Sequence, residues 1–204
     1  KYHLENTDPY DVVIVGDDAA LQFAMEYREE LFPEIPVVFE GVNDEEYAMK
    51  AAENPLVTGI IEKLSVEKNI DMALKVNPTA DKVVAILDDS VTADAERKNF
   101  YNSAENYPEL EFSEINAAEL ETARLQQAIS KVDDKTILIY IVMSKDGSGK
   151  QYTSDQALCM IVDYAKVPVY RMVEAGIGDG LLGGNVVSMY KSGEIAAQMA
   201  MDIA

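Results

Sequence analysis

The stretch Asp11-Val-Val-Ile-Val-Gly-Asp-Asp18 decides the fold, because it joins an uninterrupted apolar run to a glycine and two aspartates. A short run that is apolar at every position is typical of a strand buried on both faces of a sheet. Asp18 can cap a helix that extends to about Phe32, and Pro36-Val-Val-Phe39 is then a second predicted strand. A strand, a helix and a strand in this order predict a βαβ unit with parallel strands.

The same alternation continues to the end of the chain. Further strands are expected over residues 57–61, 82–87, 109–115, 136–142, 167–170 and 185–189, and helices over residues 44–52, 66–76, 93–101, 117–132, 154–165 and 193–203. We therefore predict an α/β fold whose parallel sheets are flanked by helices. The strand interiors should be buried, as at Val84, Ile86, Leu138, Ile139 and Ile141.

The strands fall into two groups, which predicts two lobes. Residues 82–170 supply four strands with three helices between them, enough for a self-contained lobe. Residues 11–61 supply only three strands and open directly into a core strand, so we expect the first lobe to lack N-terminal strands and helices. The first lobe should comprise residues 1–61 with 186–204, and the second lobe residues 62–185.

The charge of the chain excludes several classes of partner. Its 204 residues include 17 Lys and Arg against 37 Asp and Glu, a formal net charge of −20. Nucleic acids and anionic membrane surfaces attract basic side chains, so neither is an expected partner. The 48% of hydrophobic residues is that of a globular protein. The longest apolar run, residues 136–143, is far shorter than the roughly 20 residues of a membrane helix.

The supply of nucleophiles and bases argues against an enzyme. The chain has one Cys, Cys159, which rules out an internal disulfide, and one His, His3, close to the start of the sequence. Ser-His or Cys-His catalysis and His-rich metal sites would all need His3. Cys159 lies among apolar residues of a predicted helix, so we expect a packed core thiol. We predict no catalytic residue, no metal site and no cofactor.

Two glycine-rich segments resemble phosphate-binding motifs only in part. Gly178-Asp-Gly-Leu-Leu-Gly183 has the letters of a dinucleotide fingerprint, but a strand rather than a helix is expected after it. We interpret it as a flexible loop, and Gly178 and Gly180 as positions where the backbone can approach a ligand. The alternative is a rigid turn held by positive φ angles. Residues 146–150 lack the spacing of a phosphate loop and predict a surface turn.

Polar residues follow most of the predicted strands. In open parallel sheets, ligands bind outside the carboxyl ends of the strands, so these residues are candidate ligand contacts. The strand ends also carry Gly41, Val42, Asp88 and Met143. The residues selected as candidates are Asp17, Asp18, Asn43, Glu62, Asp89, Ser144 and Arg171. Helix capping is the alternative, and Asp18 and Asp89 both suit N-cap positions. Capping accounts for only one residue at each turn, however. Two strands are each followed by a pair of aspartates, so capping leaves one aspartate of each pair unexplained.

Several blocks of the sequence occur in the order found in a known family. They are Val15-Gly-Asp-Asp-Ala-Ala-Leu-Gln-Phe23, Leu31-Phe-Pro-Glu-Ile-Pro-Val-Val-Phe-Glu-Gly-Val-Asn43, Thr58-Gly-Ile-Ile-Glu62, Asn77-Pro78, Asp88-Asp89, Pro168-Val-Tyr170, Gly183-Gly-Asn-Val-Val-Ser188 and Gly193-Glu-Ile-Ala-Ala197. Together they resemble the periplasmic-binding-protein-like (type I) domain of the ABC-transporter substrate-binding family. The closest resemblance is to the version that serves as the extracellular sensor of histidine kinases and diguanylate cyclases.

The resemblance implies two α/β lobes with a ligand clamped between them. It places the chain crossings near residues 58–63 and 183–188, returns the last helix to the first lobe, and assigns the seven strand-end candidates to ligand binding. It implies a non-enzymatic, extracytoplasmic module that closes on a solute. The family carries no catalytic residue.

Three functions remain open at this point. The leading one is the sensor of a membrane-tethered signalling protein, and the second is the solute-binding component of an uptake transporter. The third is an α/β enzyme that uses the loop of residues 178–184. A membrane helix and a kinase or cyclase after Ala204 would favour the sensor, and a lipoprotein signal before Lys1 the transporter. Carboxylates favour an amine, an amino acid derivative or a sugar as solute, and Arg171 could pair with a ligand carboxylate.

Overall fold

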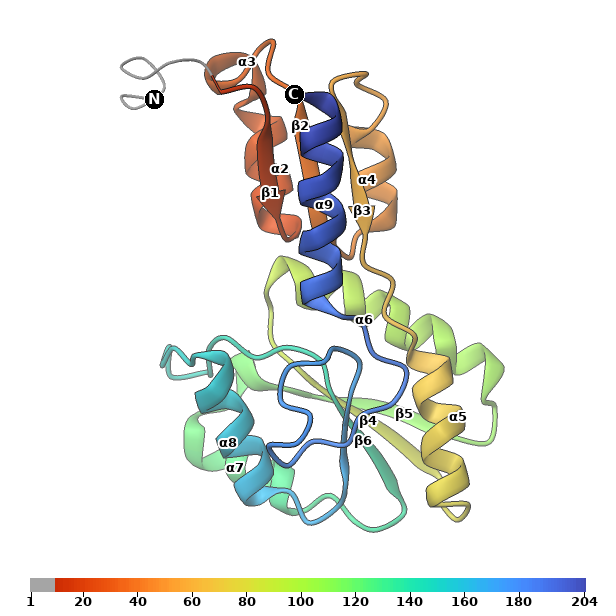
Figure 1. The fold of residues 1–204 in the computed structure, drawn as a ribbon. Coiled ribbons are helices and arrows are strands. Elements are labelled where there is room, and N and C mark those ends of the chain that lie inside the picture. Colours follow the sequence, from red (N-terminus) through yellow and green to blue (C-terminus); the bar gives the residue numbers. More distant parts are fainter. Residues whose placement is uncertain (1–9) are drawn as a thin grey trace. The chain divides into compact units, whose positions relative to one another are not determined.

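The computed structural model describes residues 10–204, and His3 lies outside this range. The chain folds into two compact units (Figure 1): unit 1 is built from residues up to Lys63 together with Ser188–Ala204, and unit 2 from Leu64–Val187. Each unit has its own sheet, and every pairing between the named strands is parallel. The predicted fold class, α/β with parallel sheets flanked by helices, is confirmed.

Unit 1 contains a three-stranded sheet with helices on both faces. The strands are β1 (Val13–Gly16), β2 (Val37–Val42) and β3 (Val57–Ile61), in that spatial order, and the helices are α2 (Asp18–Glu26), α3 (Arg28–Leu31), α4 (Glu45–Ala51) and α9 (Met189–Ile203). Val37 and Phe39 pack with residues of α2 and α4, whereas Val38 packs with Ala196 and Ala200 of α9. The period-two alternation of strand β2 thus fixes which helix covers which face.

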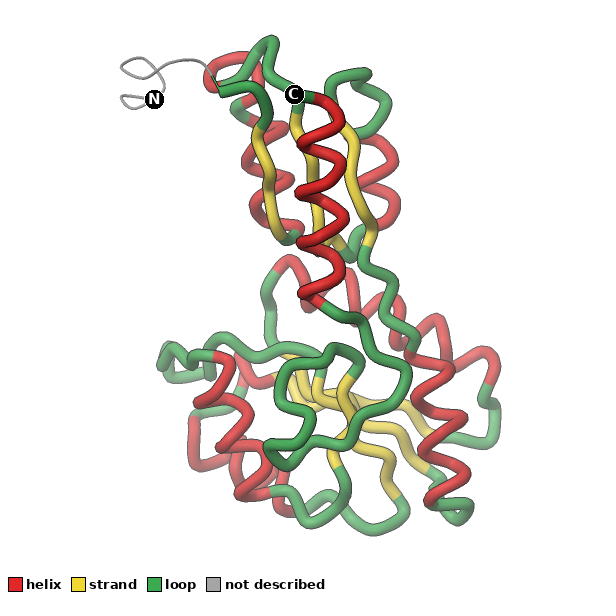
Figure 2. The backbone as a smooth tube through the Cα atoms, in the orientation of Figure 1, coloured by secondary structure: helices red, strands yellow, loops and turns green. Residues whose placement is uncertain are grey.

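Unit 2 contains a four-stranded sheet in the order β5–β4–β6–β7. Its strands are β4 (Lys82–Leu87), β5 (Glu111–Asn116), β6 (Thr136–Tyr140) and β7 (Val169–Arg171), and its helices are α5 (Val66–Val76), α6 (Val91–Ser103), α7 (Thr122–Ser130) and α8 (Ser154–Tyr164), with 3-10 turns η1 (Ala104–Asn106) and η2 (Ala117–Glu119) (Figure 2). The strand order reverses between β4 and β6. The carboxyl ends of these two strands form the switch point where such sheets bind ligands.

Two apolar clusters cover the faces of the second sheet. Ile70, Leu87 and Phe100 belong to the cluster under α5 and α6, and Leu138 and Ile161 to the cluster under α7 and α8. Four of the five strand residues predicted to be buried are buried. The exception is Val84, which is only partly buried at the margin of the second cluster.

Three predicted elements differ from those of the structure. Residues 185–189 form no strand, because only Val187 makes a bridge, to Val173, and Ser188 already caps helix α9. The predicted helix 117–132 is broken at Leu120, whose backbone is extended. The predicted helix from Asp18 to Phe32 is divided at Tyr27, where helix α2 ends. In the two helices, one residue with non-helical dihedral angles interrupts a pattern that is periodic in sequence.

Within residues 10–204, no helix is both long and apolar enough to span a bilayer.

Candidate functional site

The carboxyl edge of the unit 1 sheet begins with a strained aspartate. Asp17 is the N-cap of helix α2 and has φ 78° and ψ 157°; it is the only residue other than glycine with a positive φ among residues 10–204. This region of dihedral space is almost restricted to glycine and costs about 1–3 kcal/mol. Asp17, and not Asp18 as predicted, therefore caps the helix. Strain of this kind is concentrated at functional sites.

Asp18 holds the next loop against this edge. Its buried carboxylate accepts hydrogen bonds from the backbone N–H groups of Asn43 (3.1 Å) and Asp44 (2.9 Å). Burial raises the pKa of the Asp18 carboxyl, and these two hydrogen bonds only partly offset that effect. Because the first aspartate caps the helix and the second fixes the loop after β2, both members of this pair have structural partners.

Glu62 follows strand β3 and is the least satisfied acid of unit 1. The residue is only 8% exposed, and its buried Oε2 atom has no hydrogen-bond partner. Burial is the main reason why the pKa of the Glu62 carboxyl is raised; the charges of Glu40, Asp17 and Asp18 raise it further, and the Asn43 side chain lowers it. A buried carboxylate oxygen without a hydrogen-bond partner costs free energy in the unliganded protein.

A β-bulge places Gly41 directly beside this carboxylate. The register between β2 and β3 shifts between Phe39 and Val42, and Gly41 has φ 63°. A Cβ atom at Gly41 would lie 3.9 Å from Oε2 of Glu62 and 3.7 Å from the backbone N of Asp17. The Asn43 side chain donates a hydrogen bond to the Glu62 carbonyl oxygen (3.2 Å). The unit 1 edge is thus a compact set of Asp17, Asp18, Gly41, Asn43 and Glu62.

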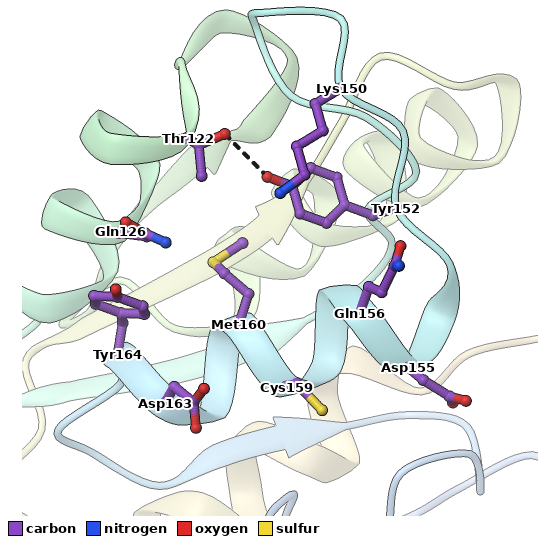
Figure 3. A pocket seen from close by; sticks show the side chains of 10 residues that line it. All are labelled: Thr122, Gln126, Lys150, Tyr152, Asp155, Gln156, Cys159, Met160, Asp163 and Tyr164. Atoms are coloured by element: carbon purple, nitrogen blue, oxygen red, sulfur yellow. Dashed lines mark hydrogen bonds between the residues drawn. The ribbon is translucent and has the colours of Figure 1, made fainter.

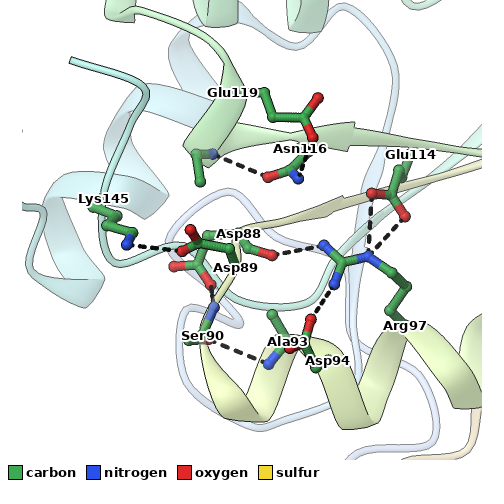
Figure 4. Close-up of polar contacts among 11 residues, drawn as sticks. Asp88, Asp89, Ser90, Ala93, Asp94, Arg97, Glu114, Asn116, Glu119 and Lys145 are labelled. Carbon is green, nitrogen blue, oxygen red and sulfur yellow. Dashed lines mark hydrogen bonds and ion pairs between the residues drawn. The ribbon is translucent and has the colours of Figure 1, made fainter. Parts of the chain in front are cut away.

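The carboxyl edge of the unit 2 sheet includes the switch point between β4 and β6, and Figure 4 shows the polar residues around the end of β4. Asp88, which directly follows β4, is fully buried and accepts hydrogen bonds from the backbone N–H of Ser90 and from both the N–H (2.7 Å) and the hydroxyl (2.6 Å) of Ser144. Burial alone would raise the pKa of Asp88, but the hydrogen bonds from Ser144 and Ser90 hold it below its usual value. Asp88 therefore joins the ends of strands β4 and β6.

Asp89 and its neighbours form the exposed part of the same edge. The Asp89 carboxylate makes an ion pair with Lys145 at 2.9 Å, and its side chain is 53% exposed. The N-cap of helix α6 is Ser90, which accepts a hydrogen bond from Ala93, so the predicted capping role of Asp89 is wrong. Arg97 pairs with Glu114 and donates to the Asp88 carbonyl oxygen (2.7 Å), as Figure 4 shows. The charged groups at this point of unit 2 are mutually paired.

Arg171, the last residue of β7, has no such partner. It is only 9% exposed, and its buried Nε atom makes no hydrogen bond. No ion pair with a carboxylate of residues 10–204 involves it. Its guanidinium carbon lies 4.2 Å from the centre of the Tyr140 ring, a cation–π contact with the neighbouring strand position. Among the predicted site residues of unit 2, Arg171 is the one with a buried side-chain donor, its Nε–H, that makes no hydrogen bond.

The glycine passage packs on helix α8 and also pairs with the end of strand β7. The Leu182 N–H donates to the Val169 carbonyl oxygen (2.8 Å), and the Leu182 carbonyl oxygen accepts from the Arg171 N–H (3.1 Å). Gly178 and Gly180 have φ 96° and 106°. A Cβ atom at Gly180 would lie 2.6 Å from Val162 of α8, whereas one at Gly178 would contact nothing. The role of Gly178 and Gly180 in ligand binding stays a prediction. No helix begins within residues 178–183, so the passage lacks the geometry of a dinucleotide fingerprint.

A separate cavity lies between helices α7 and α8 (Figure 3). Its volume is about 490 Å³, and its walls include Gln126, Lys150, Tyr152, Cys159 and Tyr164. None of the predicted site residues lines it. Cys159 is exposed here, so the prediction of a packed core thiol is wrong: the helix turns its Ala157 and Met160 inward and Cys159 outward.

The turn predicted for residues 146–150 is built around a buried carboxylate. Asp146 accepts hydrogen bonds from Thr122, Tyr152 (2.9 Å) and the hydroxyl of Ser148 (2.6 Å). Burial would raise the pKa of Asp146, but these hydrogen bonds outweigh it and lower the pKa strongly. The segment is a structural turn and offers no phosphate-binding geometry. Residues 10–204 also contain no cluster of acids, His or Cys that could hold a metal ion.

The structure thus assembles the predicted residues into two separate polar edges. The first edge brings together Asp17, Asp18, Asn43 and Glu62; the second brings together Asp89 and Ser144, with Arg171 two strand positions away from β4. Sequence reasoning placed Gly41 and Asp88 at strand ends but did not select either as a candidate ligand contact. A paired Asp-Asp does not reveal which member is buried, because that depends on the dihedral angles of the turn.

Two parallel sheets with polar residues at their carboxyl edges define an α/β protein of the ligand-binding type. The family model for ABC transporter substrate binding protein matches residues 6–204. The chain therefore belongs to the ABC transporter substrate-binding family. Its members bind solutes, act outside the cytoplasm or in the periplasm, and are in general not enzymes. No curated protein gives a significant match.

Proposed function

We propose that this chain binds a small polar solute and releases it unchanged. The observation that carries the proposal is the Glu62 carboxylate, which is buried beside the strained Asp17 and leaves Oε2 without a partner. Protein interiors satisfy nearly all such oxygens, and a donor group of a bound solute would satisfy this one. Family membership supports the same role.

The chemistry of this edge favours a solute that donates hydrogen bonds. A protonated amine or a set of hydroxyl groups would satisfy Glu62, which points to an amine, an amino acid derivative or a sugar. The further proposed contacts are Asp17, Asp18, Asn43, Asp89, Ser144, Arg171, Gly178 and Gly180.

Thermal-shift screening of the chain with amino acids, amines and sugars tests this function. A binding solute should raise the midpoint of unfolding in proportion to the logarithm of its concentration. The isosteric variant Glu62→Gln should weaken binding by roughly tenfold or more, because a charged hydrogen bond is replaced by a neutral one. Binding of every solute with equal strength by the variant would contradict the role of Glu62.

Within this family we place the chain as the sensor module of a membrane-tethered histidine kinase or diguanylate cyclase. This rests on the sequence blocks that resemble such sensors. The alternative is the solute-binding component of an uptake transporter, whose partner would be a permease. The coding sequence on both sides of residues 1–204 tests the assignment: a membrane helix with a kinase or cyclase supports the sensor, and a lipoprotein signal with an adjacent permease gene supports the transporter.

A further inference from the structure

The guanidinium of Arg171 is buried and unneutralised in a strongly acidic protein. The chain carries a net charge of −20, yet no carboxylate among residues 10–204 pairs with this arginine. The residue is nine-tenths buried, and its Nε–H has neither a protein acceptor nor access to water. Buried charges are as a rule paired, because removal from water is costly. Arg171 therefore has an unmet requirement for an anion.

The surroundings of Arg171 orient it and leave its donors available. Tyr140, from the adjacent strand β6, lies 4.2 Å from the guanidinium carbon and covers the guanidinium through its ring. The backbone N–H of Arg171 is fixed to the Leu182 carbonyl oxygen at 3.1 Å. A contact with an aromatic ring uses the π-face of a guanidinium, whereas its N–H donors lie in its plane. The guanidinium is thus held in place, while the N–H donors in its plane make no hydrogen bond with the described residues 10–204.

The other basic side chains of this edge are already neutralised. Lys145 pairs with Asp89 at 2.9 Å, and Arg97 pairs with Glu114 at 3.1 Å. Asp88 is satisfied by Ser144 and Ser90 and is not available to Arg171. The unit 2 edge therefore has one unneutralised positive charge.

We propose that Arg171 is the receptor for a carboxylate group of the bound solute, which it holds by two parallel N–H···O hydrogen bonds. This inference rests on the proposed solute-binding function and narrows its substrate class to monocarboxylates. A planar carboxylate matches the fork of a guanidinium in shape. Its single negative charge also matches the single unneutralised cation.

A phosphate group fits this edge less well. Phosphate carries close to two negative charges at neutral pH and is held in proteins by several donors at once, from a helix N-terminus or several basic residues. The strand end at Arg171 provides one cation, and Asp88 and Asp89 lie after β4 of the same sheet. Inorganic phosphate is therefore the probe that separates a carboxylate receptor from a general anion site.

The test uses the 204-residue chain and matched pairs of solutes. Amino acids and small monocarboxylates are compared with their carboxamides, alongside amines, sugars and inorganic phosphate, by thermal shift and then by calorimetry. We expect the binding solute to be a carboxylate, its carboxamide to bind at least about tenfold more weakly, and Arg171→Gln to weaken the carboxylate by at least the same factor while leaving the carboxamide unchanged. Phosphate should give no shift.

Two further variants separate a receptor from a structural residue. Arg171→Met keeps an apolar side chain against Tyr140 and removes the unpaired charge, so the unliganded protein should unfold at the same temperature or a higher one. Arg97→Met is the matched variant, because that arginine has carboxylate partners, and it should lower the unfolding temperature. The exposed Arg124→Gln has the same charge change as Arg171→Gln and should leave binding unaltered.

The outcomes distinguish this inference from the function on which it rests. A sugar or amine without a carboxylate that binds Arg171→Gln as well as the parent chain overturns the carboxylate receptor and leaves solute binding intact. Phosphate binding that depends on Arg171 also overturns it. If no solute of the panel binds, the proposed function and this inference both fail. A lower unfolding temperature of unliganded Arg171→Met would assign the arginine a structural role.

Discussion

The two units carry the same local sequence feature, a strand followed by two aspartates, but they satisfy its buried carboxylate to different degrees. One member of each pair is buried: Asp18 in unit 1 and Asp88 in unit 2. The pKa of Asp18 is raised by burial, whereas hydrogen bonds from Ser144 and Ser90 lower that of Asp88. Unit 1 leaves a carboxylate oxygen unsatisfied at Glu62, and unit 2 leaves a guanidinium unsatisfied at Arg171.

This difference teaches that a strand end is not a site merely because it is polar. Asp88 and Asp146 are polar, but their hydrogen-bonding capacity is used within the protein. Glu62 and Arg171 are informative because their capacity is not used although water is excluded from them. Unmet capacity in a buried group is what distinguishes a candidate ligand contact from a structural one.

Among the substitutions that test this difference between the units, we expect the largest loss of stability at Asp88. Asp88→Ala removes the acceptor of the Ser90 N–H and of both Ser144 donors in a fully buried position. We expect a loss of about 3 kcal/mol in the free energy of unfolding, because buried donors are left unpaired. Urea denaturation measures it. A loss below about 1 kcal/mol would show that Asp88 is as poorly satisfied as Glu62 and would remove the contrast.

The glycine passage tests whether the unit 2 edge extends beyond its strand ends. Gly180→Ala adds a Cβ atom 2.6 Å from Val162 at a φ of 106°, so the unfolding free energy should fall by roughly 2 kcal/mol. Gly178→Ala is the matched control, with a similar φ but open space, and should cost about 1 kcal/mol. Solute affinity then separates the two roles of Gly180: a solute contact would lose affinity in this variant, and a structural turn packed on α8 would keep it. A weaker affinity of Gly178→Ala at little cost in stability would return the passage to the site.

Glu62 should respond in the opposite direction to Asp88. Glu62→Gln removes a buried charge that has no partner at Oε2, so the unliganded protein should gain about 1 kcal/mol at neutral pH, or a rise of about 2–4 °C in unfolding temperature. Solute binding should weaken in the same variant. A destabilised variant would mean that Glu62 is satisfied in the protein and would break the comparison.

The difference in stability between the parent chain and Glu62→Gln should depend on pH, which provides a second measurement. The pKa of Glu62 in the folded protein lies above its ordinary value of 4.5, so the folded state holds this proton more tightly. Below pH 4.5 the carboxyl is protonated in both states and the parent chain and Glu62→Gln should be equally stable. As the pH rises through the folded pKa, the parent should lose stability relative to the variant. Thermal unfolding of both proteins between pH 4 and 8 would show a constant gap if Glu62 had an ordinary pKa.

How far the sequence predicts this molecule depends on the kind of feature. Strands such as residues 82–87 and 136–142 are apolar at nearly every position, and the pattern alone located them and hence the strand ends. It did not show that Asp17 rather than Asp18 caps α2, since that follows from a φ of 78°. It also did not show that Asp88 is the satisfied member of its pair, because its hydrogen-bond partner Ser144 lies 56 positions later in the chain. Whether a buried acid has hydrogen-bond donors thus depends on residues far away in the sequence, which a local pattern does not reveal.

The smallest effect concerns Asp89, the exposed member of the second aspartate pair. Its ion pair with Lys145 involves side chains that are 53% and 40% exposed, so water and salt screen the attraction. Asp89→Ala should therefore change the free energy of unfolding by no more than about 0.5 kcal/mol, against about 3 kcal/mol for its buried neighbour. Because Asp89 is a proposed solute contact, calorimetry should show a lower affinity at this unchanged stability. Equal affinity of the variant and the parent would leave Asp89 as a surface ion pair and confine the second edge to Ser144 and Arg171.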